Sequence, residues 1–188
     1  KFASIDVSTN VNPHIAYRDE TNTNLKYAYY NGSSWINMTL DGNWQGVDNV
    51  GEYVSLQLDS GNWPHIAYYN ATAGDLMYMY NDGSAWYKST AYSTNNVGAH
   101  ASLSLDSNDN AHIAHYNMQF QNLMYTNFGE GNWTTEPVDS VGRVGEYCAI
   151  AIDANDSPHI AYVDRDNGGA IKYAVSYTHL RAHETVGN

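Results

Sequence analysis

Short stretches of alternating apolar and polar residues follow one another along the whole chain, separated by clusters of Asn, Asp, Gly and Ser. Residues 101–105 alternate with a period of two, which is typical of a β-strand with one buried face. Residues 112–116, 123–128 and 133–138 have strand-like composition and are bounded by turn-forming clusters. Because no stretch combines a helical period with capping residues, the pattern predicts an all-β protein.

The pattern recurs around a motif of the form Pro-His-Ile-Ala-Tyr. Its histidines are His14, His65, His112 and His159, which are 51, 47 and 47 residues apart. Six residues before them stand Ser8, Asp59, Asp106 and Asp153. The tyrosines Tyr27, Tyr78, Tyr125 and Tyr173 and the tryptophans Trp35, Trp86 and Trp133 keep the same phase. A fixed period of this length indicates a repeat architecture.

Each repeat predicts four antiparallel strands, which match one blade of a β-propeller. In the first repeat the strands are expected at residues 2–7, 13–18, 25–30 and 35–40. We expect residues 1–188 to form a single propeller domain of about four blades, with the last blade incomplete or altered. The repeats span about residues 1–51, 52–98, 99–145 and 146–188. A β-solenoid and a fragment of a larger propeller are the alternatives.

The last repeat loses the pattern at its end. Residues 176–185 read Ser-Tyr-Thr-His-Leu-Arg-Ala-His-Glu-Thr, although the repeat predicts a turn and then a tryptophan at position 181. This segment resembles the translation of a sequencing adapter, a contaminant of metagenomic sequence. We therefore interpret residues 176–188 as a non-native segment and give its side chains no functional weight. A diverged last strand is the alternative.

The chain has a formal net charge of -12 and is rich in aromatic and small residues, with 17 Tyr, 5 Trp and 15 Gly. This charge argues against nucleic-acid binding, which requires a surface of Lys and Arg. No apolar run approaches the ~18 residues of a membrane-spanning helix. The one cysteine, Cys148, occupies a position held by Ala3, Val54 and Ala101 in the other repeats, so we expect it in the core.

Two features of the repeat have the residue types of metal sites. The four histidines lie in different blades, so we expect His65 and His112 to be buried structural residues that hydrogen-bond within the sheet rather than metal ligands. Asp106, Asn108 and Asn110 have the alternating oxygens of a calcium loop. Plain Asx turns explain the same spacing. We therefore expect no cofactor, with calcium at this turn as the alternative.

The three repeat tryptophans follow glycine-containing turns. This arrangement resembles the Asp-box hairpin of sialidase-type propellers, although the match is confined to the Gly and Trp positions. The resemblance implies a structural role, with each tryptophan packed between blades. More broadly, residues 2–175 resemble secreted prokaryotic β-propeller repeat proteins of the sialidase and lectin type. This resemblance implies an extracellular or cell-surface location, but not an activity, because propellers host many functions.

No hydrolase motif and no sialidase-like set of arginines is present, so we favour a non-catalytic binding or adhesion module for glycans. The candidate binding residues are Arg18, Asp19, Tyr69, Asn70, Tyr116, Asn117, Asp164 and Arg165, from the loops after the second strands, and Trp44 and Trp63, which break the repeat. One alternative is a structural subunit of a cell-surface layer or filament that associates through open blade edges. The other is a glycan-cleaving enzyme that uses carboxylates such as Asp164.

Five Asn-x-Ser/Thr sequons are compatible with a secreted, glycosylated protein. They begin at Asn31, Asn37, Asn70, Asn132 and Asn155. The expected partners are a glycan or a cell-surface molecule, and neither a nucleic acid nor a membrane.

Overall fold

The computed structural model describes residues 2–42, 48–176 and 180–183, and within these ranges it contains sixteen strands and no helix. Blade 1 consists of β1 (Ala3–Val7), β2 (Pro13–Asp19), β3 (Asn24–Tyr30) and β4 (Trp35–Asp41). Blade 2 consists of β5 (Val50–Leu58), β6 (Pro64–Asn70), β7 (Asp75–Asn81) and β8 (Trp86–Tyr92). Blade 3 consists of β9 (Val97–Leu105), β10 (Ala111–Asn117), β11 (Asn122–Gly129) and β12 (Asn132–Asp139). Blade 4 consists of β13 (Val144–Ile152), β14 (Pro158–Asp164), β15 (Ala170–Ser176) and β16 (Leu180–His183).

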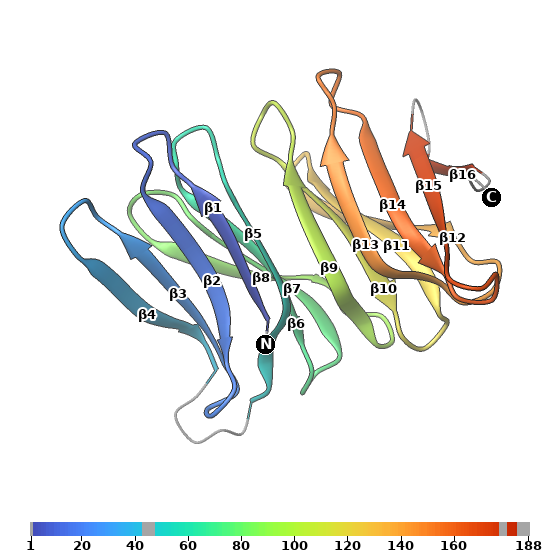
Figure 1. Cartoon of the computed structure of the whole chain (residues 1–188), viewed down its shortest axis with the longest axis horizontal. Helices are drawn as coiled ribbons and strands as arrows, with labels where there is room; N and C mark the ends of the chain where they lie inside the picture. The colour runs from blue at the N-terminus through green and yellow to red at the C-terminus, as the bar shows by residue number, and fades with distance from the viewer. Residues whose placement is uncertain (1, 43–47, 177–179, 184–188) are drawn as a thin grey trace.

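Every blade is an antiparallel meander in which the strands pair in chain order. The four sheets stand side by side from blade 1 to blade 4, with the first strand of each blade against the first strand of the next (Figure 1). The all-β propeller prediction and its strand positions are therefore confirmed. No helix in the described ranges is long and apolar enough to cross a membrane.

Three apolar clusters hold neighbouring blades together, because each lies between the facing sheets of one pair. The leucine at the second position of the third strand is fully buried in blades 1 to 3, as Leu25, Leu76 and Leu123. A glycine in the first strand of the next blade packs directly against the backbone of this leucine. A Cβ added at Gly98 would lie 2.8 Å from Cα of Leu76, and the φ of Gly98 is +101°. Only glycine permits this close approach of two backbones.

Hydroxyl and carboxylate groups join the same blades at two levels. In the inner strands, Oγ of Ser55 accepts a hydrogen bond from the backbone N–H of Leu103 at 3.0 Å, and Ser4 and Ser102 make the equivalent bonds. In the turns between the first two strands, Ser60 Oγ donates to Asp109 at 2.6 Å and Ser107 Oγ to Asp156 at 2.7 Å. We call this serine–aspartate contact between the turns of neighbouring blades, made by Ser60 with Asp109 and by Ser107 with Asp156, the turn latch.

The repeat histidines form the hydrogen bonds expected of structural residues. His65 and His112 are buried, and Nδ1 of each is hydrogen-bonded to the hydroxyl of the repeat tyrosine in the same blade, Tyr78 or Tyr125. Asp59 lies 3.4 Å from Nε2 of His65. A carboxylate there favours a proton on Nε2, so Nδ1 accepts the bond that the tyrosine donates. The prediction for these two residues is confirmed.

The repeat tryptophans behave as expected in two blades out of three. Trp86 and Trp133 are partly buried, and each lies edge-on against a tyrosine of the preceding blade, at 5.2 Å from Tyr27 and 5.0 Å from Tyr78. The expectation that each repeat tryptophan packs between blades is wrong for Trp35, which is 49% exposed. Its side of blade 1 faces no other blade among the described residues. Packing between blades therefore depends on the position of the blade and not on the residue alone.

The end of the last repeat continues the sheet. The backbone of β16 pairs with β15, with Leu180 opposite Ser176. This position is that of the outermost strand in the other blades, so the chain forms a fourth strand there although its sequence departs from the repeat. The origin of residues 176–188 stays an interpretation. Cys148 is buried as predicted, its thiol donates to the backbone carbonyl of His100, and burial raises the pKa of the thiol to about 12.

Candidate functional site

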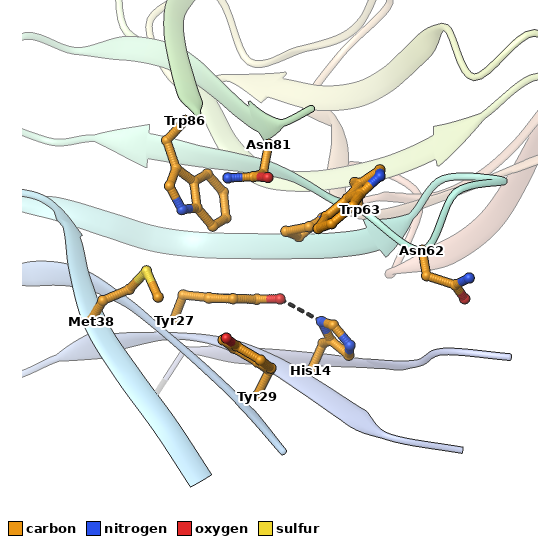
Figure 2. A pocket seen from close by; sticks show the side chains of 9 residues that line it. His14, Tyr27, Tyr29, Met38, Asn62, Trp63, Asn81 and Trp86 are labelled. Carbon is orange, nitrogen blue, oxygen red and sulfur yellow. Dashed lines mark hydrogen bonds between the residues drawn. The ribbon is translucent and has the colours of Figure 1, made fainter. Parts of the chain in front are cut away.

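The first cavity of interest lies between blade 1 and blade 2 and has a volume of about 200 Å³. We call it pocket 1. Its lining residues are His14, Tyr27, Tyr29 and Met38 from blade 1 and Asn62, Trp63, Pro64, Asn81 and Trp86 from blade 2. Figure 2 shows the blade 1 residues on one side of the cavity and the indole rings of Trp63 and Trp86 on the other.

A second cavity of about 250 Å³, pocket 2, lies between blade 2 and blade 3. Its lining residues are His65, Tyr78, Tyr80 and Ser89 from blade 2 and Asp109, Asn110, Ala111, Phe128 and Trp133 from blade 3. These nine positions are those of pocket 1 moved along the chain by one repeat. The same cavity therefore recurs at two successive blade interfaces.

The walls of both pockets are aromatic. In pocket 1 the rings of His14 and Tyr29 stack with centroids 5.7 Å apart, and Trp86 closes the far side against Tyr27. In pocket 2 the corresponding distance from His65 to Tyr80 is also 5.7 Å. Alternation along the third strand directs both tyrosines of each blade, such as Tyr27 and Tyr29, toward the same face. The ring faces and edges provide the apolar area that a small ligand would cover.

Polar groups also line both pockets. Pocket 1 has the amides of Asn62 and Asn81, and pocket 2 has the carboxylate of Asp109 and the amide of Asn110. The amide oxygen of Asn62 already has a partner within the protein, because Oδ1 accepts a hydrogen bond from the backbone N–H of Thr9 at 2.7 Å. Asp109 receives two hydrogen bonds from Ser60 in the turn latch. Amide and carboxylate groups of this kind can donate to or accept from the hydroxyls of a ligand.

Burial keeps the histidines of the pockets uncharged. It lowers the pKa of His14 and His65 from the ordinary value, and the nearby carboxylates of Asp6 and Asp59 oppose the shift only in part. Both rings are therefore neutral at pH 7. The hydroxyls of Tyr27 and Tyr78 stay protonated, because burial raises their pKa. Apart from the carboxylate of Asp109 in pocket 2, the lining residues carry no charge, which suits a neutral ligand.

The equivalent position between blades 3 and 4 has different residues on the blade 3 side. His112 and Tyr125 are present, but Asn127 replaces Tyr80 and Glu136 replaces Ser89. Ser157 stands where Trp63 and Asn110 stand in the other two sites. The aromatic wall formed by the second tyrosine is thus confined to pockets 1 and 2.

Most of the binding residues expected from the sequence lie elsewhere, at the ends of the second strands. Four of them accept hydrogen bonds from backbone N–H groups two or three residues later and so close the turns: Asp19, Asn70, Asn117 and Asp164. Their repeated occurrence has a structural reason, because a side-chain acceptor at this position replaces a backbone partner. Ligand binding by them stays a prediction.

The predicted binding residues next to these turn residues also form contacts within the protein. Arg18 is nearly buried and lies 3.1 Å from Glu20 and 3.3 Å from Glu52. Tyr69 donates to Asn96 at 2.6 Å, and Tyr116 packs near His100. Arg165 pairs with Glu146 at 2.7 Å. Of the predicted binding residues, Trp63 alone lines one of the two pockets, and Trp44 lies outside the described residues.

The turn proposed as a calcium loop is explained by its internal hydrogen bonds. Oδ1 of Asp106 accepts the backbone N–H groups of Asn108 and Asn110, both at 2.8 Å, and Oδ2 lies 3.5 Å from Nε2 of His112. In blades 2 to 4 the acid six residues before the histidine, Asp59, Asp106 or Asp153, therefore closes the turn and faces the ring. In the described part of the chain, no group of three or more His, Cys, Asp or Glu is placed to hold a metal ion.

The sequons differ in exposure. Asn31, Asn37, Asn132 and Asn155 are exposed. Asn70 is half-buried, and its Oδ1 accepts the backbone N–H of Thr72 at 3.0 Å, so modification there would compete with the turn.

Sequence reasoning missed most of the pocket residues. Tyr29 and Tyr80 follow the repeat tyrosine by two positions, and Asn62 and Asp109 occupy one turn position. Their equivalent positions in successive repeats are the signal that could have identified them. The sequence does not show that these positions form a pocket, because the two halves of each pocket come from different repeats and meet only across a blade interface.

No protein-family model and no curated protein matches the chain. Solved structures match it closely in fold and distantly in sequence. The lectin SapL1, solved with α-methyl fucoside, is 12% identical with a TM-score of 0.69, and the match covers 98% of this chain and 63% of SapL1. A variant of the Aleuria aurantia lectin AAL, solved with Fucα1-6GlcNAc, is 15% identical with a TM-score of 0.61, and the match covers 98% of this chain and 61% of AAL.

An enzyme also has this arrangement of strands. The α-L-arabinofuranosidase PaAbf62A from Podospora anserina, solved with cellotriose, is 11% identical with a TM-score of 0.55, and the match covers 96% of this chain and 65% of the enzyme. The chain thus spans less than two thirds of the length of each of these three proteins. At these identities the likeness establishes the fold alone, which is a β-propeller architecture that the chain shares with these lectins and with the arabinofuranosidase.

Proposed function

We propose that the protein is a non-catalytic glycan-binding module in which pocket 1 and pocket 2 each bind one sugar ring. The observation that carries the proposal is the recurrence of the same nine lining positions in two successive blade interfaces. Repeated sites in one chain allow multivalent binding, in which the second sugar of a clustered glycan binds at a raised effective concentration. Solved lectins with this fold support the class of ligand.

The size of the pockets fits one small ring. Their volumes of about 200 and 250 Å³ lie below the range of ~300–1,000 Å³ that is typical of sites for drug-sized ligands. An aromatic wall can cover the apolar face of a sugar, and the amides of the lining can bind its hydroxyls. The lining favours a neutral sugar over an acidic one, because a carboxylate would find no cation among the lining residues and would be repelled by Asp109 in pocket 2.

The composition of the pockets also favours binding over cleavage. Glycoside hydrolysis ordinarily uses two carboxylates on opposite sides of the bond that breaks. The lining of pocket 1 contains no Asp or Glu, and that of pocket 2 contains only Asp109. Both oxygens of Asp109 are hydrogen-bonded to Ser60. A glycan-cleaving function is the second candidate, since the arabinofuranosidase shares the fold.

We place this binding activity outside the cell or on its surface. Free glycans and glycoproteins are most accessible there, and four of the five sequons are exposed on the surface. Glycosylation and the surface location are parts of the proposal.

The test combines a glycan array with isothermal titration calorimetry, using neutral methyl glycosides, including α-methyl fucoside, as probes. The intact chain should bind two equivalents of the preferred sugar. Trp63→Ala should weaken one of the two sites about 3- to 10-fold, because loss of a stacked aromatic ring costs about 0.5–1.5 kcal/mol, and should leave the other site unchanged. Phe120→Ala is the control, since Phe120 is exposed on the loop after β10 and lines neither pocket.

Failure to bind any neutral sugar at millimolar concentration would contradict the proposal. So would equal weakening by the Trp63 and Phe120 variants. Release of arabinose or another sugar from a substrate by the intact chain would replace it with the enzymatic alternative.

A further inference from the structure

The side chain of Trp63 is a large aromatic surface at the edge of pocket 1. Its backbone is fixed in the turn between β5 and β6, because its N–H donates to Oδ1 of Asp59 at 2.7 Å and its carbonyl accepts the N–H of Asp59 at 2.9 Å. The residue is nevertheless 43% exposed. Figure 2 shows its indole across the cavity from His14 and Tyr29. The ring therefore has free area beside the cavity that a ligand could cover.

Two turns of blade 2 make room for this indole with glycine. Gly61 lies in the turn between β5 and β6, and Gly83 lies in the turn between β7 and β8. A Cβ added at Gly61 would lie 2.9 Å from Cδ1 of the indole, and one added at Gly83 would lie 2.7 Å from Cζ2. In both cases the nearest atoms belong to Trp63 and not to the backbone, so a methyl group at either position would displace the ring.

Backbone conformation does not explain the glycine at position 61, because its φ lies outside the left-handed region. The other three repeats have asparagine at this position, as Asn10, Asn108 and Asn155. The same repeats lack the tryptophan, and have Asn12, Asn110 and Ser157 in its place. Glycine thus occurs at this turn position only in the repeat that carries Trp63. Its contact with the indole gives the physical reason.

Gly83 combines two reasons for being glycine. Its φ is +90°, and its equivalent in blade 1, Gly32, has a φ of +91°. Nothing lies within 4 Å of a Cβ added at Gly32, whereas the same atom at Gly83 meets the indole. In blade 3, where the tryptophan is absent, Glu130 stands at this position with a φ of 52°. Gly83 and Gly32 therefore form a pair that differs in the contact with Trp63.

We infer that Gly61 and Gly83 are positioning residues that hold the Trp63 indole as the stacking platform for the sugar in pocket 1. This inference rests on the proposed function. A ring that two turns already hold in place loses little conformational freedom when a ligand binds, so more of the stacking energy contributes to affinity. Pocket 2 has Asn110 at the position of Trp63, and Nδ2 of Asn110 donates to Asp106 at 2.9 Å. The platform therefore belongs to pocket 1 and distinguishes the two sites.

The test is calorimetric titration of the intact chain with neutral methyl glycosides, with α-methyl fucoside and methyl β-galactoside as probes. Gly61→Ala should weaken one of the two sites about 3- to 10-fold, as expected for loss of a stacked ring, and leave the other unchanged. The double variant Gly61→Ala/Trp63→Ala should bind no more weakly than Trp63→Ala, because the glycine acts only through the indole. General loss of structure would instead weaken both sites.

Gly83→Ala and Gly32→Ala provide the matched control. Both substitutions place a side chain at nearly the same positive φ, but only the first meets the indole. Gly83→Ala should weaken the same site as Gly61→Ala, and Gly32→Ala should weaken neither site. Thermal unfolding of each variant would confirm that the fold is retained. Equal weakening by the two alanine substitutions at positive φ would overturn the role of Gly83.

Oxidative footprinting read by mass spectrometry tests the position of the indole without any ligand. Gly61→Ala should raise the oxidation rate of Trp63 and leave that of Trp35 in blade 1 unchanged. If Trp63→Ala weakens binding and Gly61→Ala does not, the inference is wrong and the proposed function stands. If the intact chain binds no sugar, the proposed function fails, and the oxidation rates alone then decide whether the two glycines position the indole.

Discussion

Tyr78 of blade 2 lies edge-on against Trp133 of blade 3, with ring centroids 5.0 Å apart and ring planes at 74°. Both residues come from the repeat, yet they belong to different copies of it. The same pairing of Tyr27 with Trp86 shows that the unit that buries these rings is an interface between blades and not a single blade. Stability and the proposed ligand binding therefore depend on the same surfaces.

The first prediction concerns this ring pair. Trp133→Ala should lower the free energy of unfolding by about 2–4 kcal/mol, somewhat less than the ~3–5 kcal/mol of a fully buried tryptophan, because the indole is only partly buried. Trp35→Ala removes the equivalent ring from the open side of blade 1 and should cost less than about 1 kcal/mol. Urea unfolding of both variants measures the two losses. Equal costs would contradict the blade-dependent role of the tryptophans.

The second prediction concerns the structural histidines. His65→Leu should lower the free energy of unfolding by about 1–3 kcal/mol, because it leaves the buried hydroxyl of Tyr78 without its partner. Tyr78→Phe in the same background removes that hydroxyl and should recover part of the loss. A double-mutant cycle in denaturant measures the coupling between the two residues. Additive costs would mean that the hydrogen bond contributes nothing to stability.

The third prediction is a pH dependence that originates in His115. This residue replaces the tyrosines Tyr68 and Tyr162 of other blades, and its Nε2 is 2.9 Å from the hydroxyl of Thr126. Complete burial lowers the pKa of His115 to about 3 from 6.5. The unfolded chain therefore binds the extra proton between these values, and the free energy of unfolding should fall as pH decreases from 6.5 toward 3, by about 1.4 kcal/mol per unit.

His115→Leu removes this proton uptake by the unfolded chain. The variant should lose stability less steeply than the wild type when urea unfolding is measured at pH 4, 5, 6 and 7. Carboxylates with lowered pKa, such as Asp139, act in both proteins, so the comparison isolates the histidine. The same pH dependence in both proteins would contradict the assignment.

The fourth prediction separates backbone strain from close packing. Gly98 and Gly32 both have positive φ, at +101° and +91°, but only Gly98 lies against the backbone of a neighbouring blade. Gly32→Ala should cost about 1–2 kcal/mol, from the conformation alone. Gly98→Ala should cost about 1–3 kcal/mol more, because its Cβ would lie 2.8 Å from Cα of Leu76. Thermal unfolding of both variants measures the difference. Equal decreases in the unfolding temperature would show that the two blades can move apart at this contact without an energetic cost.

The sequence by itself determined the blade. Strand positions, strand order and the burial of His65 and His112 all follow from alternation and from a fixed period, since hydrogen bonding along a meander is local and each repeat carries a complete set of strands. The repeat also identified its own structural positions, such as Asp59 and Trp86, although the reason for them appeared only with the contacts that they make.

The tertiary structure decided what happens between blades. Pocket 1 joins Tyr29 to Trp63, two residues in different repeats whose proximity no pattern within one repeat records. The exposure of Trp35, despite its place in the repeat, likewise depends on whether another blade covers it. A periodic sequence specifies the faces of each unit, but burial and cavities arise where two faces meet, so the candidate site depends on which blades are neighbours.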